Sequence, residues 1–261
     1  MSTYRVIAAL GSSFAAGPGI EPVADAGAMR SQRNYARQLA DRVGAELVDL
    51  TVSGATTANV IDTPQQSLTG STYPPQMQGV PARADVVTVT AGGNDLQFAS
   101  AMFYISLRRI APESPLLPMM GGMFEDGIPV PTNETVAAAT SGLVRVVETA
   151  REKAPNARIL LVDYLTVLDF DSLDHTPFDQ DELEQFLVIQ TAIGRVFRDA
   201  AAHTGADLVL ASALSAGHAL GSSTPWVQPF HQDMAIAAGS FHPNEAGMTA
   251  IAEELQRILE L

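Results

Sequence analysis

The chain has 261 residues, of which 46% are hydrophobic and 17% charged, so its composition is that of a globular protein and not of a disordered one. Its 15 Lys and Arg against 29 Asp and Glu give a net charge of −14, which would repel a phosphate backbone, so we expect no nucleic-acid partner. The absence of cysteine excludes disulfides and thiolate metal sites.

The first residues, MSTYRVIAAL, contain one Arg and too few apolar residues before Gly11 for a signal peptide or a membrane span. We therefore expect a cytoplasmic protein that is not stably inserted in a membrane. A signal removed ahead of Met1 would leave the same sequence, so secretion stays open as an alternative.

Five short apolar runs rich in Val, Ile and Leu predict the strands of a parallel sheet that is covered on both faces. They are 4–10, 45–50, 84–91, 157–165 and 206–211. Segments with helical periodicity separate or follow them, at 30–44, 134–153, 182–203 and 244–261. This alternation indicates one three-layer, doubly wound α/β domain over residues 1–261.

Two long segments without clear periodicity are predicted as loops, at 67–83 and 103–131. Loops of this length in a compact domain are usually functional or mobile. The second is apolar and rich in Met and Pro, so it either forms a wall of a pocket or covers the core.

Ligands of a doubly wound sheet bind at the carboxyl ends of its strands, so the residues that follow each run are the site candidates. Gly11, Ser12 and Ser13 follow the first run. They do not form a phosphate loop, because the further glycines and the Lys of such loops are missing. Such a turn on its own is more often structural.

The later runs are followed by further candidates. Gly54 lies in a turn of small residues that could present a backbone N–H. Asn94 is an uncharged donor or else a turn residue, and Asp95 is placed to cap the next helix. His242 precedes Pro243 at the start of the last helix. The other histidines lack the spacing of metal ligands, so neither a metal nor a cofactor is expected.

A serine, a histidine and several N–H donors are what acyl transfer needs, since a base must deprotonate the nucleophile and donors must stabilise the oxyanion. Four blocks carry these groups: Gly-x-Ser at 11–13, Gly54, Gly-x-Asn-Asp at 92–95 and His-Pro-Asn at 242–244. Their order resembles the SGNH (GDSL-type) hydrolase family. The resemblance implies a flavodoxin-like fold and a serine esterase or lipase.

By this resemblance Ser13 aligns with the nucleophile and His242 with the base. The backbone N–H groups of Ser13 and Gly54 and the side-chain amide of Asn94 align with the oxyanion hole. Ser12 stands where the family usually has Asp, at a supporting position, so the change is not expected to remove activity.

A second departure precedes the histidine, because Gly239 occupies the position where the family commonly has Asp. Either a main-chain carbonyl near Gly239 orients the imidazole, as in some family members, or a distant acid such as Asp233 does. We favour the carbonyl, since losing the carboxylate weakens the orientation of the base without removing the base.

The sequence therefore predicts a monomeric or weakly associating esterase or lipase that hydrolyses small-molecule or lipid esters through an acyl-enzyme. One alternative is an acyl thioesterase or acyltransferase that uses the same serine. Another is a catalytically silent ester- or glycan-binding module, suggested by the missing Asp.

Overall fold

The computed structural model describes residues 4–67, 69–233 and 236–259. A five-stranded sheet lies at its centre, with every pair of neighbouring strands parallel and the order β4-β1-β7-β8-β9. Its strands are β1 (Val6–Gly11), β4 (Glu46–Asp49), β7 (Val86–Thr90), β8 (Arg158–Val162) and β9 (Asp207–Val209). Each strand overlaps one of the five predicted runs. The order is that of flavodoxin-like folds, so the predicted fold class is confirmed.

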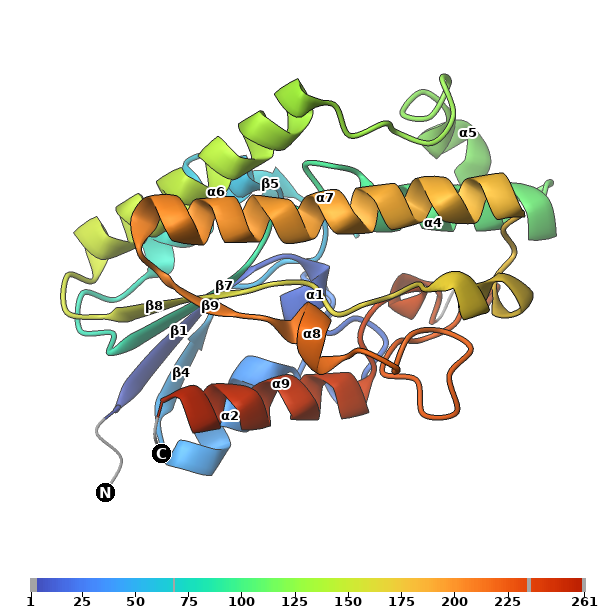
Figure 1. Cartoon of the computed structure of the whole chain (residues 1–261). Helices are drawn as coiled ribbons and strands as arrows, with labels where there is room; N and C mark the ends of the chain where they lie inside the picture. Colours follow the sequence, from blue (N-terminus) through green and yellow to red (C-terminus); the bar gives the residue numbers. More distant parts are fainter. Residues whose placement is uncertain (1–3, 68, 234–235, 260–261) are drawn as a thin grey trace.

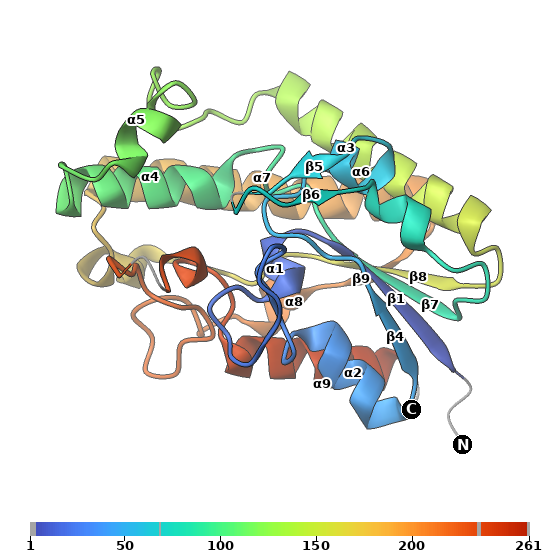
Figure 2. The same cartoon turned by 180° about the vertical axis from the view of Figure 1, so that it is seen from behind.

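Helices cover both faces of this sheet (Figures 1 and 2). On one face α2 (Tyr35–Val43) packs beside α9 (Glu245–Ile258). On the other face α6 packs against both α3 and α7; their bounds are α3 (Thr57–Ile61), α6 (Asn133–Lys153) and α7 (Gln180–Thr204). The sheet therefore forms the middle layer of three.

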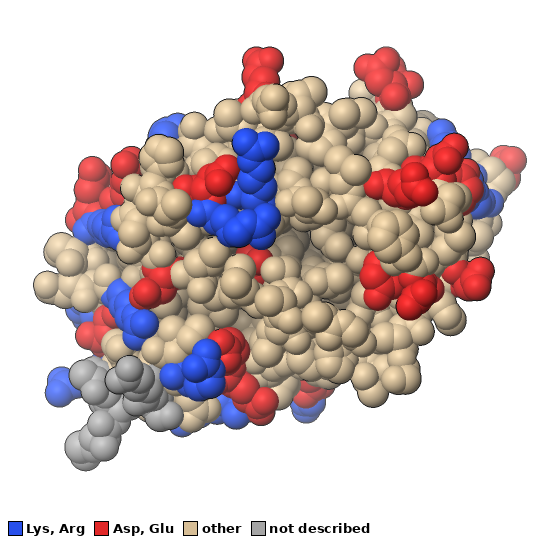
Figure 3. Space-filling view, viewed as in Figure 1, with Lys and Arg blue, Asp and Glu red and all other residues tan. Residues whose placement is uncertain are grey.

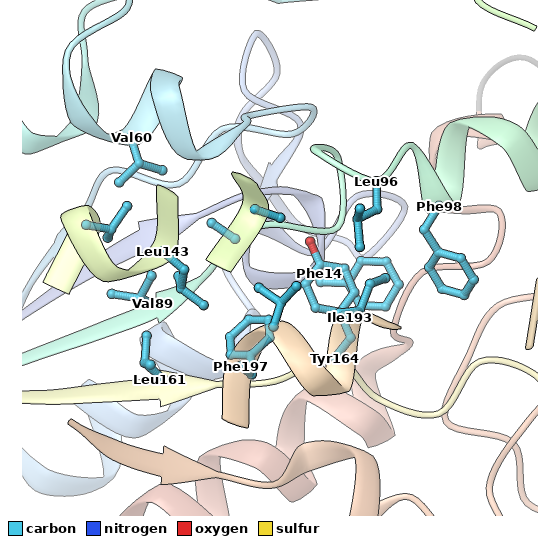
Figure 4. Close-up of a cluster of buried hydrophobic side chains, with 14 of the residues drawn as sticks. Phe14, Val60, Val89, Leu96, Phe98, Leu143, Leu161, Tyr164, Ile193 and Phe197 are labelled. Atoms are coloured by element: carbon cyan, nitrogen blue, oxygen red, sulfur yellow. The ribbon is translucent and has the colours of Figure 1, made fainter. Parts of the chain in front are cut away.

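Strand β1 shows how the sequence builds two cores. Its side chains alternate between the faces, so that Ala8 and Leu10 belong to the cluster under α6 and α7, while Ile7 and Ala9 belong to the cluster under α2 and α9. Figure 4 shows part of the first cluster, including Phe197. Because both faces are buried, the strand reads as a continuous apolar run and not as an alternating one.

The remaining helices, 3-10 turns and hairpins connect these layers. The helices are α1 (Ser13–Ala16), α4 (Phe98–Ile110), α5 (Leu116–Gly121) and α8 (Ala211–Leu214), with the 3-10 turns η1 (Gln76–Gly79), η2 (Phe170–His175) and η3 (Ala237–Gly239). Two hairpins pair β2 (Val23–Asp25) with β3 (Arg30–Ser31) and β5 (Gln65–Gln66) with β6 (Thr72–Tyr73).

The segment 103–131 is not the loop that its Met and Pro content suggested. Its first part belongs to α4, and α5 lies further along. The α4 sequence has neither Gly nor Pro, and Met102, Ile105 and Ser106 fall on its buried side. Pro112 then ends the helix, because the residue before a proline avoids the helical conformation. The predicted loop at 67–83 likewise contains β6 and η1.

The predicted helix at 30–44 begins later than its periodicity suggested. Arg30 and Ser31 pair with β2, and α2 begins only at Tyr35. The side chain of Asn34 accepts a hydrogen bond from the backbone N–H of Arg37 and so caps the helix at this point.

Charged side chains are unevenly spread over the surface. On the face in Figure 3 an uncharged area extends from the centre to the lower right, and acidic side chains lie along its edges.

In the described part of the chain no helix has the length and apolar character needed to cross a bilayer.

Candidate active site

The turn from β1 into α1 places Ser13 at the carboxyl edge of the sheet. Gly11 has a φ of 146°, and a side chain there would collide with the backbone carbonyl of Thr90. The side-chain amide of Gln76 accepts from Gly11 N–H at 2.8 Å and donates to its carbonyl at 2.9 Å. The chain therefore turns sharply, and Ser13 becomes the first residue of α1.

Ser13 and His242 lie 229 residues apart in sequence, yet their side chains are hydrogen-bonded. The distance from Ser13 Oγ to His242 Nε2 is 2.7 Å, and Nδ1 of the same ring lies 2.8 Å from the carbonyl oxygen of Ser240. A carbonyl can only accept, so Nδ1 must carry the proton and Nε2 must accept from the serine hydroxyl. This tautomer is the one that a general base needs.

The electrostatic environment keeps His242 neutral. Burial lowers the pKa of His242 to about 4, and the hydrogen bond to the Ser240 carbonyl opposes this shift. A histidine whose pKa lies below neutrality is unprotonated at pH 7 and can take a proton from the serine.

The carbonyl that faces the ring belongs to Ser240 and not to Gly239, one residue from the predicted position. The Gly239 carbonyl instead accepts from the backbone N–H of His242 at 3.0 Å. A side chain at Gly239 would collide with the amide of Gln228, which donates to two backbone carbonyls. An acid at this position would have to displace that amide. Asp233 is exposed, whereas His242 is buried.

A strained residue sets the direction of the Ser240 carbonyl. Phe241, between Ser240 and His242, is fully buried and has a φ of 62°. Left-handed backbone costs an aromatic residue about 1–3 kcal/mol and persists only where the surroundings impose it. Here the backbone N–H of Gln228 donates to the His242 carbonyl at 2.8 Å, and the backbone carbonyl of Gln228 accepts from the Phe241 N–H at 3.0 Å. This pairing holds the turn.

The predicted donors Gly54 and Asn94 lie on adjoining turns. Asn94 Nδ2 donates to the carbonyl of Ala55 at 2.9 Å, which leaves its second amide hydrogen for another acceptor. Gly54 has a φ of 84°, and within the described ranges its N–H, like that of Ser13, has no acceptor. Among the described residues, the backbone N–H groups of Ser13 and Gly54 and one amide hydrogen of Asn94 are thus left to bind another acceptor.

Asp95 does not cap the helix that follows it, contrary to the prediction. Its carboxylate accepts from the backbone N–H of Thr57 at 3.1 Å and from its hydroxyl at 2.6 Å, at the start of α3. Gln97 instead precedes α4, with a φ of 56° and no capping side-chain bond. Asp95 therefore ties the Asn94 turn to the segment that follows Gly54.

Ser12 and Ser13 have different surroundings although they are adjacent. Ser12 is fully buried, and its Oγ lies 2.9 Å from the hydroxyl of Tyr164. Tyr164 and Gln76 were not identified from the sequence, and for His242 the sequence predicted a main-chain carbonyl near Gly239 without naming Ser240. The signal for Tyr164 was available, since a hydroxyl at the end of the fourth run is a strand-end polar group. Gln76 and the Ser240 carbonyl carry no such signal.

Comparison with known proteins places the chain in a family. Residues 9–250 match the model of the GDSL-like lipase/acylhydrolase family. The chain belongs to this family. It is also 30% identical over 268 residues to Lipase 2 of Streptomyces coelicolor, with 97% of this chain and 85% of that protein covered. The protein is thus an SGNH-type ester hydrolase, as the sequence predicted.

Two solved structures of similar fold come from Streptomyces species. An extracellular lipase of Streptomyces rimosus matches with a TM-score of 0.67 and 20% identity, covering 97% of this chain and 99% of that one. A phospholipase A1 of Streptomyces albidoflavus NA297 matches with a TM-score of 0.68 and 21% identity, covering 98% and 99%. At this identity the two structures support the SGNH fold alone.

Proposed function

We propose that the protein hydrolyses carboxylic esters through an acyl-enzyme, with Ser13 as nucleophile and His242 as base. The observation that carries the proposal is the 2.7 Å hydrogen bond from Ser13 Oγ to Nε2 of a ring whose Nδ1 faces the Ser240 carbonyl. A buried, neutral imidazole of the correct tautomer beside a serine hydroxyl is a base–nucleophile pair.

In the first half-reaction His242 removes the Ser13 proton as Oγ attacks the ester carbonyl carbon. The Ser13 N–H, the Gly54 N–H and the Asn94 amide then donate to the oxyanion. The imidazolium returns its proton to the departing alcohol, which leaves the acyl group on Ser13. In the second half-reaction a water molecule loses a proton to His242 and attacks the acyl carbon. The imidazolium then returns the proton to Ser13 Oγ as the carboxylic acid leaves. The Ser240 carbonyl holds the ring throughout, and we retain it in preference to the exposed Asp233.

We infer that the acyl chain lies in a cavity beside the Asn94 turn. The cavity has a volume of about 410 Å³, and the residues that line it are Gln97, Gly122, Met123, Glu125, Asp126, Gly127, Ile128, Pro129 and Val130. Gln97 N–H donates to the Asn94 carbonyl at 3.1 Å, so the cavity begins within one turn of the oxyanion donor. The lipase names of the relatives support lipid or medium-chain esters as substrates.

A charge placed in this cavity is expected to shorten the preferred acyl chain. Met123→Glu should lower kcat/KM for p-nitrophenyl octanoate about tenfold relative to the acetate, since each buried methylene contributes about 0.8 kcal/mol. Met123 is 54% exposed and lines the cavity, whereas Met119 is 79% exposed and does not. Met119→Glu is therefore the matched control. Equal acyl-length profiles for the two variants would contradict this placement of the acyl chain.

Covalent labelling tests the function itself. A fluorophosphonate is expected to inactivate the protein and to modify Ser13, as peptide mass spectrometry would show, because only an activated serine reacts readily. A folded protein that is neither labelled nor active on p-nitrophenyl esters would be the silent binding module. Faster turnover of acyl thioesters, or transfer to added alcohols, would favour the thioesterase or acyltransferase.

Location and assembly stay predictions from the sequence. We retain a monomeric or weakly associating protein whose partners are small-molecule or lipid esters. Cytoplasmic location is the expectation for this sequence, and the Streptomyces rimosus lipase is named as extracellular, so secretion is the alternative.

A further inference from the structure

A row of hydrogen-bonding groups crosses the carboxyl ends of β1, β7 and β8 beneath the candidate site. Gly93 N–H donates to the Tyr164 hydroxyl at 3.2 Å, the Tyr164 hydroxyl lies 2.9 Å from Ser12 Oγ, and Ser12 Oγ lies 3.4 Å from the Thr90 carbonyl oxygen. We call these four groups the hydroxyl bridge. Ser12 is 0% and Tyr164 5% exposed, so the protein must satisfy their hydroxyls internally.

The direction of each bond in the hydroxyl bridge follows from its two ends. Gly93 N–H can only donate and the Thr90 carbonyl can only accept. The Tyr164 hydroxyl must therefore donate to Ser12, and the Ser12 hydroxyl must donate to Thr90. Bonds that all run in one direction strengthen one another. Burial raises the pKa of Tyr164, so its hydroxyl keeps the proton that this arrangement requires.

The hydroxyl bridge joins the two turns that carry the proposed chemistry. Ser12 immediately precedes Ser13, and Gly93 immediately precedes Asn94. Any side chain at Gly93 would come within about 2.6 Å of the Tyr164 ring, so glycine is what allows this close approach. One tyrosine oxygen thus contacts both turns.

The Tyr164 ring adds a packing contact to these hydrogen bonds. It lies against the Phe14 ring with 4.1 Å between centroids, and the two rings overlap in Figure 4. Phe14 in turn lies 5.1 Å from the ring of His242. The same side chain therefore supports the nucleophile turn, the oxyanion turn and, through Phe14, the base.

We propose that Tyr164 is a positioning residue whose hydroxyl fixes the Ser13 turn relative to the Asn94 amide. This proposal rests on the proposed ester hydrolysis at Ser13. Ser12 fits the role because a serine hydroxyl both accepts from Tyr164 and donates to Thr90. An aspartate, which the family usually has at this position, is acceptor-only when ionised and could not donate to that carbonyl.

Removing one oxygen atom tests the proposal. Tyr164→Phe is expected to lower kcat for p-nitrophenyl acetate about tenfold with KM changed less than about twofold, since small misplacements of reacting groups act on the transition state. The rate of fluorophosphonate labelling should fall by a similar factor. Ser12→Ala should match it, because both changes break the same bond between Tyr164 and Ser12. The double variant should therefore lose about tenfold and not about a hundredfold.

Tyr35→Phe is the matched control. Tyr35 is also fully buried, and its hydroxyl is bonded to the Thr90 side chain at 2.9 Å, but it contacts neither Ser12 nor Gly93. We expect it to lower Tm as Tyr164→Phe does while kcat stays at the wild-type value.

Wild-type kcat in Tyr164→Phe, or an equal loss in Tyr35→Phe, would overturn the positioning role. If Tyr164→Phe does not fold, Ser12→Ala tests the same bond, and its wild-type kcat would overturn the role equally. The parent proposal fails differently. Labelling and esterase activity that persist in Ser13→Ala would remove the proposed nucleophile, whatever Tyr164→Phe does.

Discussion

Replacing Ser13 by Ala is expected to lower kcat toward p-nitrophenyl acetate by about 10⁴ or more, because no acyl-enzyme can form without the hydroxyl. The fold should survive the change. Among the described residues the side chain of Ser13 is hydrogen-bonded only to His242, and that ring keeps its other bond, to the Ser240 carbonyl. Steady-state kinetics beside a circular dichroism melt would separate loss of chemistry from loss of fold.

Ser106→Ala provides the control for this variant. Ser106 is buried in α4, and its hydroxyl donates to the Met102 carbonyl at 2.8 Å within the same helix. The substitution removes a buried serine hydroxyl whose hydrogen bond stays within α4 and does not involve a proposed site residue, so kcat should be unchanged. Activity in Ser13→Ala above about a hundredth of wild type, measured on freshly purified protein, would rule out Ser13 as the nucleophile under this mechanism.

The sheet could be predicted because its central strands are buried on both faces and its edge strands, β4 and β9, still pack apolar residues against both clusters. Each of the five strands then reads as an apolar run. Because parallel neighbouring strands need long crossover connections, helical segments are expected between the runs. The candidate site residues could be found because parallel strands bring their carboxyl ends to one edge. Ser13 and Asn94 were found as polar groups that follow a strand, and Gly54 as a possible backbone donor in the turn after one.

The features that the sequence did not predict depend on the direction of a backbone carbonyl and on hydrogen bonds between residues far apart in the sequence. The Ser240 carbonyl faces His242 only because Phe241 adopts a left-handed conformation, which no pattern of residue types indicates for a phenylalanine. Gln76 binds both backbone groups of Gly11 across 65 residues. The helix α4 is a different case, because its own sequence is helical but the Met- and Pro-rich segment that follows it is typical of a loop.

Asn94→Ala is expected to lower kcat by about 10²–10³, the usual effect of deleting one oxyanion donor. KM should change little, since the amide acts most strongly on the charge that develops in the transition state. Stability should change little as well. The side chain is only partly buried, and its one hydrogen bond within the described residues is to the Ala55 carbonyl. Steady-state kinetics with p-nitrophenyl acetate and a thermal melt give both values.

Asn34→Ala should give the opposite pattern and so serves as the control. Asn34 is fully buried, caps α2 through the N–H of Arg37 and donates to Asp49 at 2.7 Å. Losing such a cap costs about 1 kcal/mol or more of stability, while kcat should stay at the wild-type value. If Asn94→Ala instead lowers Tm and leaves kcat unchanged, Asn94 is a turn residue. The oxyanion hole must then be built from the backbone N–H groups of Ser13 and Gly54 alone.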